Sequence, residues 1–219
     1  MAKMNNSSPP RNVIYNHLVN WFSANPKRYN LIHYLVNWGL PYDYVTKIIN
    51  SRPNDRVLEI ACGPALILDY LFDIDYLGID SNQQHLDYAS KKYSDRKHTT
   101  FINADIFTYD FLQHGNFDKI LMLGFLHHLS NKELKTLLPI VASLLNKKNE
   151  QTKLVTFDPV RTKYHFLSNK LCDLDVGRYD RYDYEYRNII NKYFHIKQSN
   201  IITSRTKASV YIVNEAIID

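Results

Sequence analysis

The sequence is poor in cysteine and has no long hydrophobic run. Its 219 residues include two cysteines, Cys62 and Cys172, which lie far apart and form no C-x-x-C pair. This spacing argues against a disulfide framework and against a zinc knuckle. No apolar stretch reaches the roughly 20 residues that a membrane-spanning helix needs, and the polar first residues do not resemble a signal peptide. We therefore expect a cytoplasmic protein with no metal site and no membrane segment.

Charge of one sign is not concentrated anywhere in the chain. The formal net charge is +5, yet acidic and basic residues are interspersed, and there is no dense basic stripe of the kind that binds nucleic acid. The pattern argues against nucleic acid as a partner. Hydrophobic residues make up 45 % of the chain, which is enough for a sizeable core. The length suits one domain with a small appendage, and the oligomeric state does not follow from the sequence.

Helix-like and strand-like segments are not evenly distributed along the chain. Residues 1–10 are polar and predict a flexible tail, while residues 11–50 carry apolar and aromatic residues at helical spacing and predict a helical cap. From 51 to 219, five apolar strand-like stretches alternate with helices, which is typical of a parallel sheet with helices on both faces. One of these helices follows a capping box formed by Ser130 and Glu133. The last two strand-like stretches predict an antiparallel hairpin.

The stretch "VLEIACGPA", from Val57 to Ala65, predicts a strand that runs into a tight turn and the start of a helix. Such a turn presents backbone N–H groups at the carboxyl end of the strand. A dinucleotide loop needs G-x-G-x-x-G, and here Ala61 and Leu66 take the two outer positions, which disfavours a nicotinamide oxidoreductase. A Walker A loop is also absent. Gly63 leaves room for one close approach, and we expect the alanines at 61 and 65 to have negative φ angles.

The loop resembles motif I of the class I S-adenosylmethionine-dependent methyltransferases, which is acid-x-G-x-G-x-G. Here Glu59, Ala61, Gly63 and Ala65 fill those positions. The stretches "YLGID", "NAD" and "FDKILMLGF" resemble the family's next three strands, so that the resemblance covers about residues 56–159 and the final hairpin. It implies a seven-stranded, mostly parallel Rossmann-like sheet with helices on both faces and an antiparallel final strand. A helical N-terminal extension would precede a methyltransferase domain over 51–219.

The resemblance also implies S-adenosylmethionine as the cofactor and S-adenosylhomocysteine as its product. In the family, the acid of motif I lies near the methionine ammonium, which here is Glu59. Asp80 would accept both ribose hydroxyls, and Asp105 with Ile106 would contact the adenine. The full set of cofactor-binding residues that the resemblance implies is Glu59, Ala61, Gly63, Asp80, Ser81, Asp105, Ile106 and Leu123.

Methyl transfer from a sulfonium mainly requires alignment of the acceptor, and a base is needed only if the acceptor must lose a proton. The stretch "LHHL" lies between the fourth strand and the helix that follows it, beside the expected position of the methyl group. We expect the side chains of His127 and His128 to diverge, with one of them facing the pocket as a catalytic base. The alternative is that one packs under the helix and the other is solvated.

The acceptor site is expected between the fifth strand and the final hairpin. The fifth strand ends in "TFDP", which places Asp158 near the acceptor. Asp175, Gly177, Tyr179 and Arg181 form a D-x-G-x-Y-x-R segment that resembles one in bacterial small-molecule methyltransferases. In this interpretation Tyr179 contacts the acceptor, and the arginines at 178 and 181 clamp its carboxylate or phosphate. An exposed loop whose arginines pair with neighbouring aspartates is the alternative.

These patterns together predict a methyltransferase that modifies an O or N atom of a small, acidic molecule. Two other interpretations remain open. An RNA or protein methyltransferase would be expected to show a basic groove or an added binding domain, and the N-P-P-Y motif of some nucleic-acid enzymes is absent after the fourth strand. A catalytically silent cofactor-binding module of the same fold would account for the alanines in motif I.

Overall fold

The computed structural model describes residues 31, 40–174 and 177–218. The tail predicted over 1–10, most of the helical cap predicted over 11–50, and Asp175 lie outside the described residues. The described part of that cap contains helix α3, Tyr42–Ile49. No helix in the described ranges is long and apolar enough to span a membrane.

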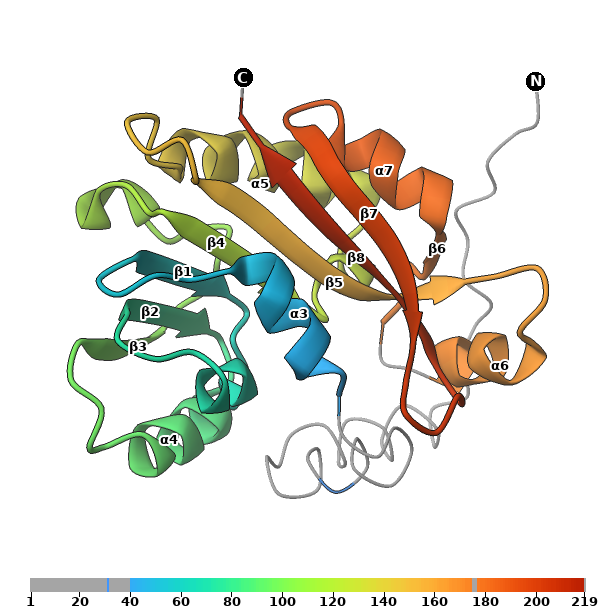
Figure 1. The fold of residues 1–219 in the computed structure, drawn as a ribbon, viewed down its shortest axis with the longest axis horizontal. Helices are drawn as coiled ribbons and strands as arrows, with labels where there is room; N and C mark the ends of the chain where they lie inside the picture. The colour runs from blue at the N-terminus through green and yellow to red at the C-terminus, as the bar shows by residue number, and fades with distance from the viewer. Residues whose placement is uncertain (1–30, 32–39, 175–176, 219) are drawn as a thin grey trace.

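In the described part of the chain, seven strands form a continuous sheet in the order β3-β2-β1-β4-β5-β8-β7 (Figure 1). Neighbours among β1 to β5 are parallel, and β8 is antiparallel to both β5 and β7. A two-residue strand, β6, pairs with the end of β5. The bounds are β1 Arg56–Ile60, β2 Asp75–Asp80, β3 Thr99–Asn103, β4 Lys119–Leu123, β5 Lys153–Arg161, β6 Arg181–Tyr182, β7 His195–Thr203 and β8 Val210–Ile217. The predicted sheet and its terminal hairpin are confirmed.

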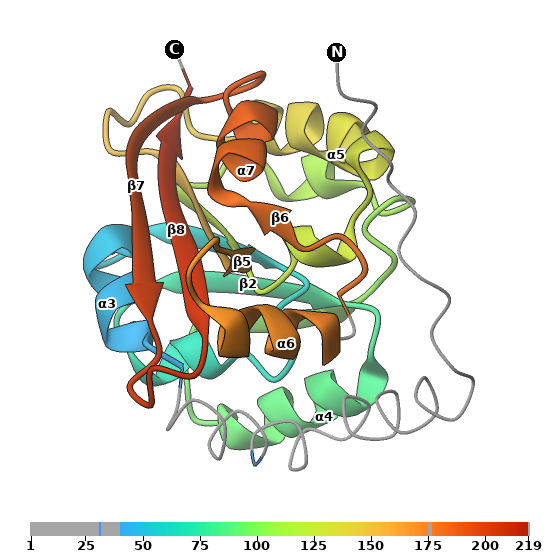
Figure 2. The same ribbon diagram turned by 90° about the vertical axis from the view of Figure 1, so that its right-hand side faces the viewer.

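Helices cover both faces of this sheet (Figures 1 and 2). α5 (Asn131–Leu144) and α7 (Asp183–Ile190) pack on one face, while α3 and α4 (Gln83–Lys92) pack on the other. Neighbouring residues of the central strands alternate between the two cores, as strand geometry requires. Ile120 and Met122 of β4 belong to the core under α5, whereas Leu121 belongs to the core under α3. The strands are therefore apolar on both sides, which explains their continuous hydrophobic runs.

Two local features of the helices bear on the predictions. The capping box is confirmed: the Ser130 hydroxyl accepts from the Glu133 N–H, and the Glu133 carboxylate accepts from the Ser130 N–H.

The segment after motif I, predicted as a helix, forms only a short 3₁₀ helix, η1 (Leu66–Asp69). Its hydrogen bonds close over three residues, because the chain must already turn toward β2 at Asp75.

Candidate functional site

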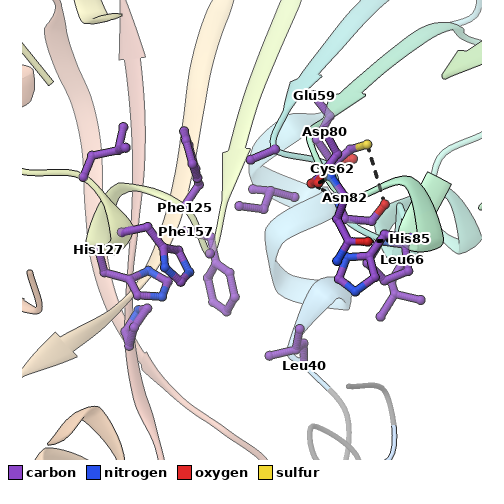
Figure 3. A pocket seen from close by; sticks show the side chains of 18 of the residues that line it. Leu40, Glu59, Cys62, Leu66, Asp80, Asn82, His85, Phe125, His127 and Phe157 are labelled. Atoms are coloured by element: carbon purple, nitrogen blue, oxygen red, sulfur yellow. Dashed lines mark hydrogen bonds between the residues drawn. The ribbon is translucent and has the colours of Figure 1, made fainter. Parts of the chain in front are cut away.

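A cavity of about 820 Å³ opens beside the carboxyl ends of the parallel strands. It lies where the strand order reverses, between β1 and β4, which is where open α/β sheets bind their ligands. The volume is in the range of small-molecule sites, roughly 300–1,000 Å³. Figure 3 shows Glu59 and Asp80 on one side of this cavity and His127 on the other, with Phe157 between them.

The loop after β1 is held in a left-handed conformation at three positions. The φ angles of Ala61, Gly63 and Ala65 are 58°, 52° and 52°. Our expectation that both alanines have negative φ is therefore wrong. The turn needs these angles because Cys62 N–H donates to the Ile79 carbonyl at 3.0 Å while its own carbonyl accepts from Ala65 N–H at 2.9 Å. A residue with a Cβ in this region costs roughly 1–2 kcal/mol.

Asp80, at the end of β2, is fixed by the backbone of this loop. Its Oδ2 accepts from the Gly63 N–H at 2.7 Å, and its Oδ1 accepts from the Asn82 N–H at 2.7 Å. A carboxylate offers about four acceptor positions. Each oxygen of Asp80 can therefore accept one more hydrogen bond from a molecule in the cavity.

Glu59 lies at the same end of the cavity and is 3 % exposed. Burial raises the pKa of this carboxyl group to about 8; the hydrogen bond from the Tyr76 hydroxyl lowers it and the negative charge of Asp80 raises it. Below that pH, Glu59 holds a proton before a ligand binds. A cation placed beside it would favour the charged form.

The remaining cofactor residues that the sequence predicts also lie at the cavity. Asp105 follows β3, where its Oδ1 accepts from the Phe107 N–H at 2.9 Å, and Ile106 is buried beside it. The lining includes every residue of the predicted set, namely Glu59, Ala61, Gly63, Asp80, Ser81, Asp105, Ile106 and Leu123. Asn82 and His85 also line the cavity and were not among the predicted residues. Asn82 caps the start of α4, and its position just before that helix was the available signal.

His127 and His128 form a short 3₁₀ helix with Leu126, η3 (Leu126–His128), and both line the cavity. We expected the two rings to diverge, but they lie against each other. The centroids lie 4.1 Å apart with a 41° angle between the planes. His127 is 4 % exposed, whereas His128 is exposed to solvent.

Asp158 of β5 orients His127 from behind. Its Oδ1 lies 2.9 Å from His127 Nδ1 and 3.1 Å from the His127 backbone nitrogen. Asp158 has no exposed surface, and burial raises the pKa of its carboxyl group while the contacts with His127 and the charge of Arg181 lower it. An Nδ1–H bond to this carboxylate selects the tautomer in which Nε2 takes a proton. Asp158 is not among the cavity-lining residues, so it reaches the site through His127 rather than by touching an acceptor.

Arg181 is buried beneath the same turn, where it binds backbone oxygens. Its Nη1 donates to the carbonyls of Leu126 and Tyr179 at 2.9 and 3.0 Å, and its Nη2 donates to the carbonyl of Leu129 at 2.6 Å. Nε and Nη2 also donate to Asn131 Oδ1. The Leu126 carbonyl also accepts from the Leu129 N–H at 3.2 Å, so the guanidinium is a second donor to Leu126 and a donor to the carbonyls of Leu129 and Tyr179. This differs from the predicted acceptor clamp, since Arg181 does not line the cavity.

The other predicted acceptor residues, Arg178 and Tyr179, lie close to Arg181 in the sequence. Arg178 is exposed and Tyr179 is partly buried, and neither lines the cavity. The Tyr179 N–H donates to the His127 carbonyl at 2.9 Å. A Cβ added at Gly177 would lie 2.0 Å from Cδ2 of His127, so only glycine fits there. The described part of the D-x-G-x-Y-x-R segment therefore supports the histidine turn.

Comparisons with known proteins agree with this architecture. Residues 57–148 match a family model described as a methyltransferase domain. The N-methyltransferase NodS from Bradyrhizobium japonicum WM9, in complex with S-adenosylhomocysteine, superposes with a TM-score of 0.68 at 13 % identity; the match covers 93 % of this chain and 98 % of that chain. No curated protein sequence matches the chain.

Two further solved structures share the fold. Magnesium protoporphyrin IX methyltransferase (ChlM) from Synechocystis PCC 6803 with bound S-adenosylhomocysteine has a TM-score of 0.63 and 18 % identity, covering 82 % of this chain and 84 % of that chain. The [4+2]-cyclase SpnF has a TM-score of 0.65 and 13 % identity, covering 82 % and 80 %. The chain therefore has the fold of the class I, Rossmann-like S-adenosylmethionine-dependent methyltransferases, and residues 57–148 match the methyltransferase domain model. The resemblance drawn from motif I is confirmed.

Proposed function

We propose that this protein transfers a methyl group from S-adenosylmethionine to an oxygen or nitrogen atom of a small molecule, with His127 as the general base. The proposal rests on one observation: Glu59, Asp80 and His127 line the same cavity, and His127 is paired with Asp158 (Figure 3). We further propose that residues 51–219 form the catalytic domain and that 11–50 cap it.

The residues at one end of the cavity suit a cationic ligand without phosphate. Asp80 can accept two more hydrogen bonds, as a ribose with two hydroxyls requires, and Glu59 offers a carboxylate for an ammonium group. The loop of Gly63 lacks the glycines that a pyrophosphate needs. The bound S-adenosylhomocysteine in NodS and ChlM, which share this fold, is consistent with this assignment.

When bound, S-adenosylmethionine supplies an activated methyl group on a sulfonium. His127 then takes a proton from the acceptor at Nε2, and Asp158 stabilises the imidazolium that forms. Phe125 and Phe157, at the cavity wall, exclude water from the path of the methyl group. Arg181 and Gly177 hold the turn that positions His127.

Replacing Asp80 with alanine is expected to weaken S-adenosylmethionine binding by about 1–3 kcal/mol, the scale of hydrogen bonds to a charged group. Titration calorimetry measures this directly. Asp87 of α4 is exposed and does not line the cavity, so that Asp87→Ala is the matched control and should bind as the parent does. An Asp80→Ala variant that folds and binds with unchanged affinity would remove Asp80 from the cofactor site.

The affinity for S-adenosylmethionine is expected to rise as the pH increases from about 6 to about 8. Glu59 has a raised pKa of about 8 before the ligand binds and must lose its proton before it can attract an ammonium group. Each pH unit below that value can therefore cost up to roughly tenfold in affinity. In a Glu59→Gln variant, the pH dependence of the affinity should reflect only the titration of the ligand itself. Equal pH slopes in parent and variant would show that Glu59 does not face the ammonium.

A non-methylating use of the fold is the second candidate. The alanines with positive φ in motif I favour it, and SpnF, whose fold this chain shares, is a [4+2]-cyclase. Binding of S-adenosylmethionine without formation of S-adenosylhomocysteine from any acceptor would support this candidate.

A further inference from the structure

The end of the cavity around His127 is mostly apolar. Its walls include Phe125, Phe157, Pro159, Leu171, Val210 and Tyr211. Among the residues that the structure describes, no lysine or arginine lines the cavity. The described polar groups at this end are the side chains of His127, His128, Ser168 and Ser209 and the hydroxyl of Tyr211. The Ser168 hydroxyl already accepts from the Val210 N–H at 2.9 Å.

Two arginines of the neighbouring segments, Arg161 and Arg181, are engaged in other contacts. Arg181 donates to the carbonyls of the histidine turn, as described above. Arg161 pairs with Asp173 at 2.7 Å and lies 3.7 Å from Asp180. An anionic acceptor would lose its hydration in the cavity without gaining a positive partner from these residues, and burial of an unpaired charge is strongly unfavourable. The lining therefore favours a neutral acceptor.

The shape of the wall favours a flat acceptor. Phe157 and Tyr211 are stacked, with ring centroids 4.6 Å apart and an angle of 27° between their planes. Both rings line the cavity, and Phe157 lies between the acidic end and His127 (Figure 3). Aromatic faces and edges of this kind pack well against another ring.

The strength of the base narrows the acceptor group. The pKa of an imidazolium, ordinarily about 6.5, is closer to the pKa of a phenol, about 10, than to that of an aliphatic hydroxyl, which is far higher. Proton transfer to His127 is therefore much easier from a phenol. A phenol also combines the flat apolar body and the single polar group that this end of the cavity can accommodate.

We infer that the methyl acceptor is a neutral phenol whose ring packs against Phe157 and whose hydroxyl faces His127. This inference rests on the proposed function. The phenolic oxygen forms a bond to the methyl carbon as the carbon–sulfur bond breaks, and the electron pair of that bond remains on the sulfur, which becomes a neutral thioether. The phenolic proton passes to His127 Nε2 and then to water. The products are an aryl methyl ether and S-adenosylhomocysteine.

The test compares two probes with the same ring system, 2-naphthol and 2-naphthoic acid. Binding of each is measured by calorimetry on protein loaded with S-adenosylhomocysteine, and methylation by mass spectrometry with S-adenosylmethionine. We expect 2-naphthol to bind at least about tenfold more tightly than the acid and to give 2-methoxynaphthalene. Equal or tighter binding of the acid overturns the inference, and so does the absence of binding by both probes.

Charge added to the wall provides the complementary test. Leu171→Arg places a cation at the cavity and should shift the preference toward 2-naphthoic acid, whereas Leu167→Arg on the same helix, α6 (Phe166–Leu174), is exposed, lies outside the lining and should not. An unchanged preference in a folded Leu171→Arg variant counts against the site. Failure of S-adenosylhomocysteine to bind would instead refute the proposed function, and the comparison of the two probes on the protein without cofactor would still test the preference for a neutral ring.

Discussion

Replacing Asp158 with asparagine is expected to lower kcat by about 10²–10⁴-fold, the range attributed to a positioned general base and the carboxylate that orients it. Asparagine keeps the shape of the side chain but removes the negative charge that stabilises protonated His127. S-adenosylmethionine affinity should change little, because Asp158 does not line the cavity. The measurements are steady-state kinetics with an acceptor that the parent protein methylates, and calorimetry with the cofactor.

A pH–rate profile separates this positioning role from a merely structural one. Without the buried carboxylate the imidazolium loses its counter-charge, so the acidic limb of the profile should move to lower pH in Asp158→Asn. The double variant His127→Ala/Asp158→Asn should be no slower than His127→Ala alone, since residues that act as a unit are not additive. Full activity of Asp158→Asn, or additive losses in the double variant, would show that the pair does not act together.

Replacing Arg181 with alanine is expected to reduce the free energy of unfolding by about 3 kcal/mol, because each buried carbonyl left without its donor costs roughly 1–3 kcal/mol. Three carbonyls lose a hydrogen bond, those of Leu126, Leu129 and Tyr179, although Leu126 keeps the one from the Leu129 N–H. kcat should fall as well, since this turn carries His127. Urea denaturation, monitored by circular dichroism, measures the free energy of unfolding. kcat is then measured on the folded protein.

Arg178 is the matched control for this substitution because it is exposed. Arg178→Ala should change the free energy of unfolding by less than about 0.5 kcal/mol. Arg181→Lys should fall between parent and alanine, because lysine keeps the charge but cannot donate to several carbonyls at once. An Arg181→Ala variant of parental stability with a raised KM for acidic acceptors would restore the predicted role as a clamp.

The cofactor end of the cavity was largely predictable because its groups are fixed by strand ends. Asp80 and Asp105 follow β2 and β3 directly, and the carboxyl ends of parallel strands meet at one edge. The role of Arg181 was not predictable in this way. All of its partners except Tyr179 lie 50 to 55 residues away in sequence, and most are backbone carbonyls, which leave no mark on the side-chain pattern.

The histidine turn shows the same limit. The sequence brought His127 and Asp158 forward as separate candidates, one for catalysis and one for the acceptor, because nothing local indicates that β5 passes behind η3. Their pairing depends on the packing of two segments that are 31 residues apart. The left-handed alanines were missed for a similar reason: one of the hydrogen bonds that hold their loop runs from the Cys62 N–H to the carbonyl of Ile79 on β2, which is distant in sequence.

The two alanines of motif I also bear on how the rest of the sequence can change. Ala61 and Ala65 hold left-handed angles in the folded chain, and each such angle costs roughly 1–2 kcal/mol on folding. Net stabilities of domains are typically only about 5–15 kcal/mol. A chain with this loop therefore stands closer to the threshold of unfolding than one with glycine at both positions. Fewer destabilising substitutions can accumulate elsewhere in the domain before it unfolds, which narrows the routes along which new acceptor specificities could evolve.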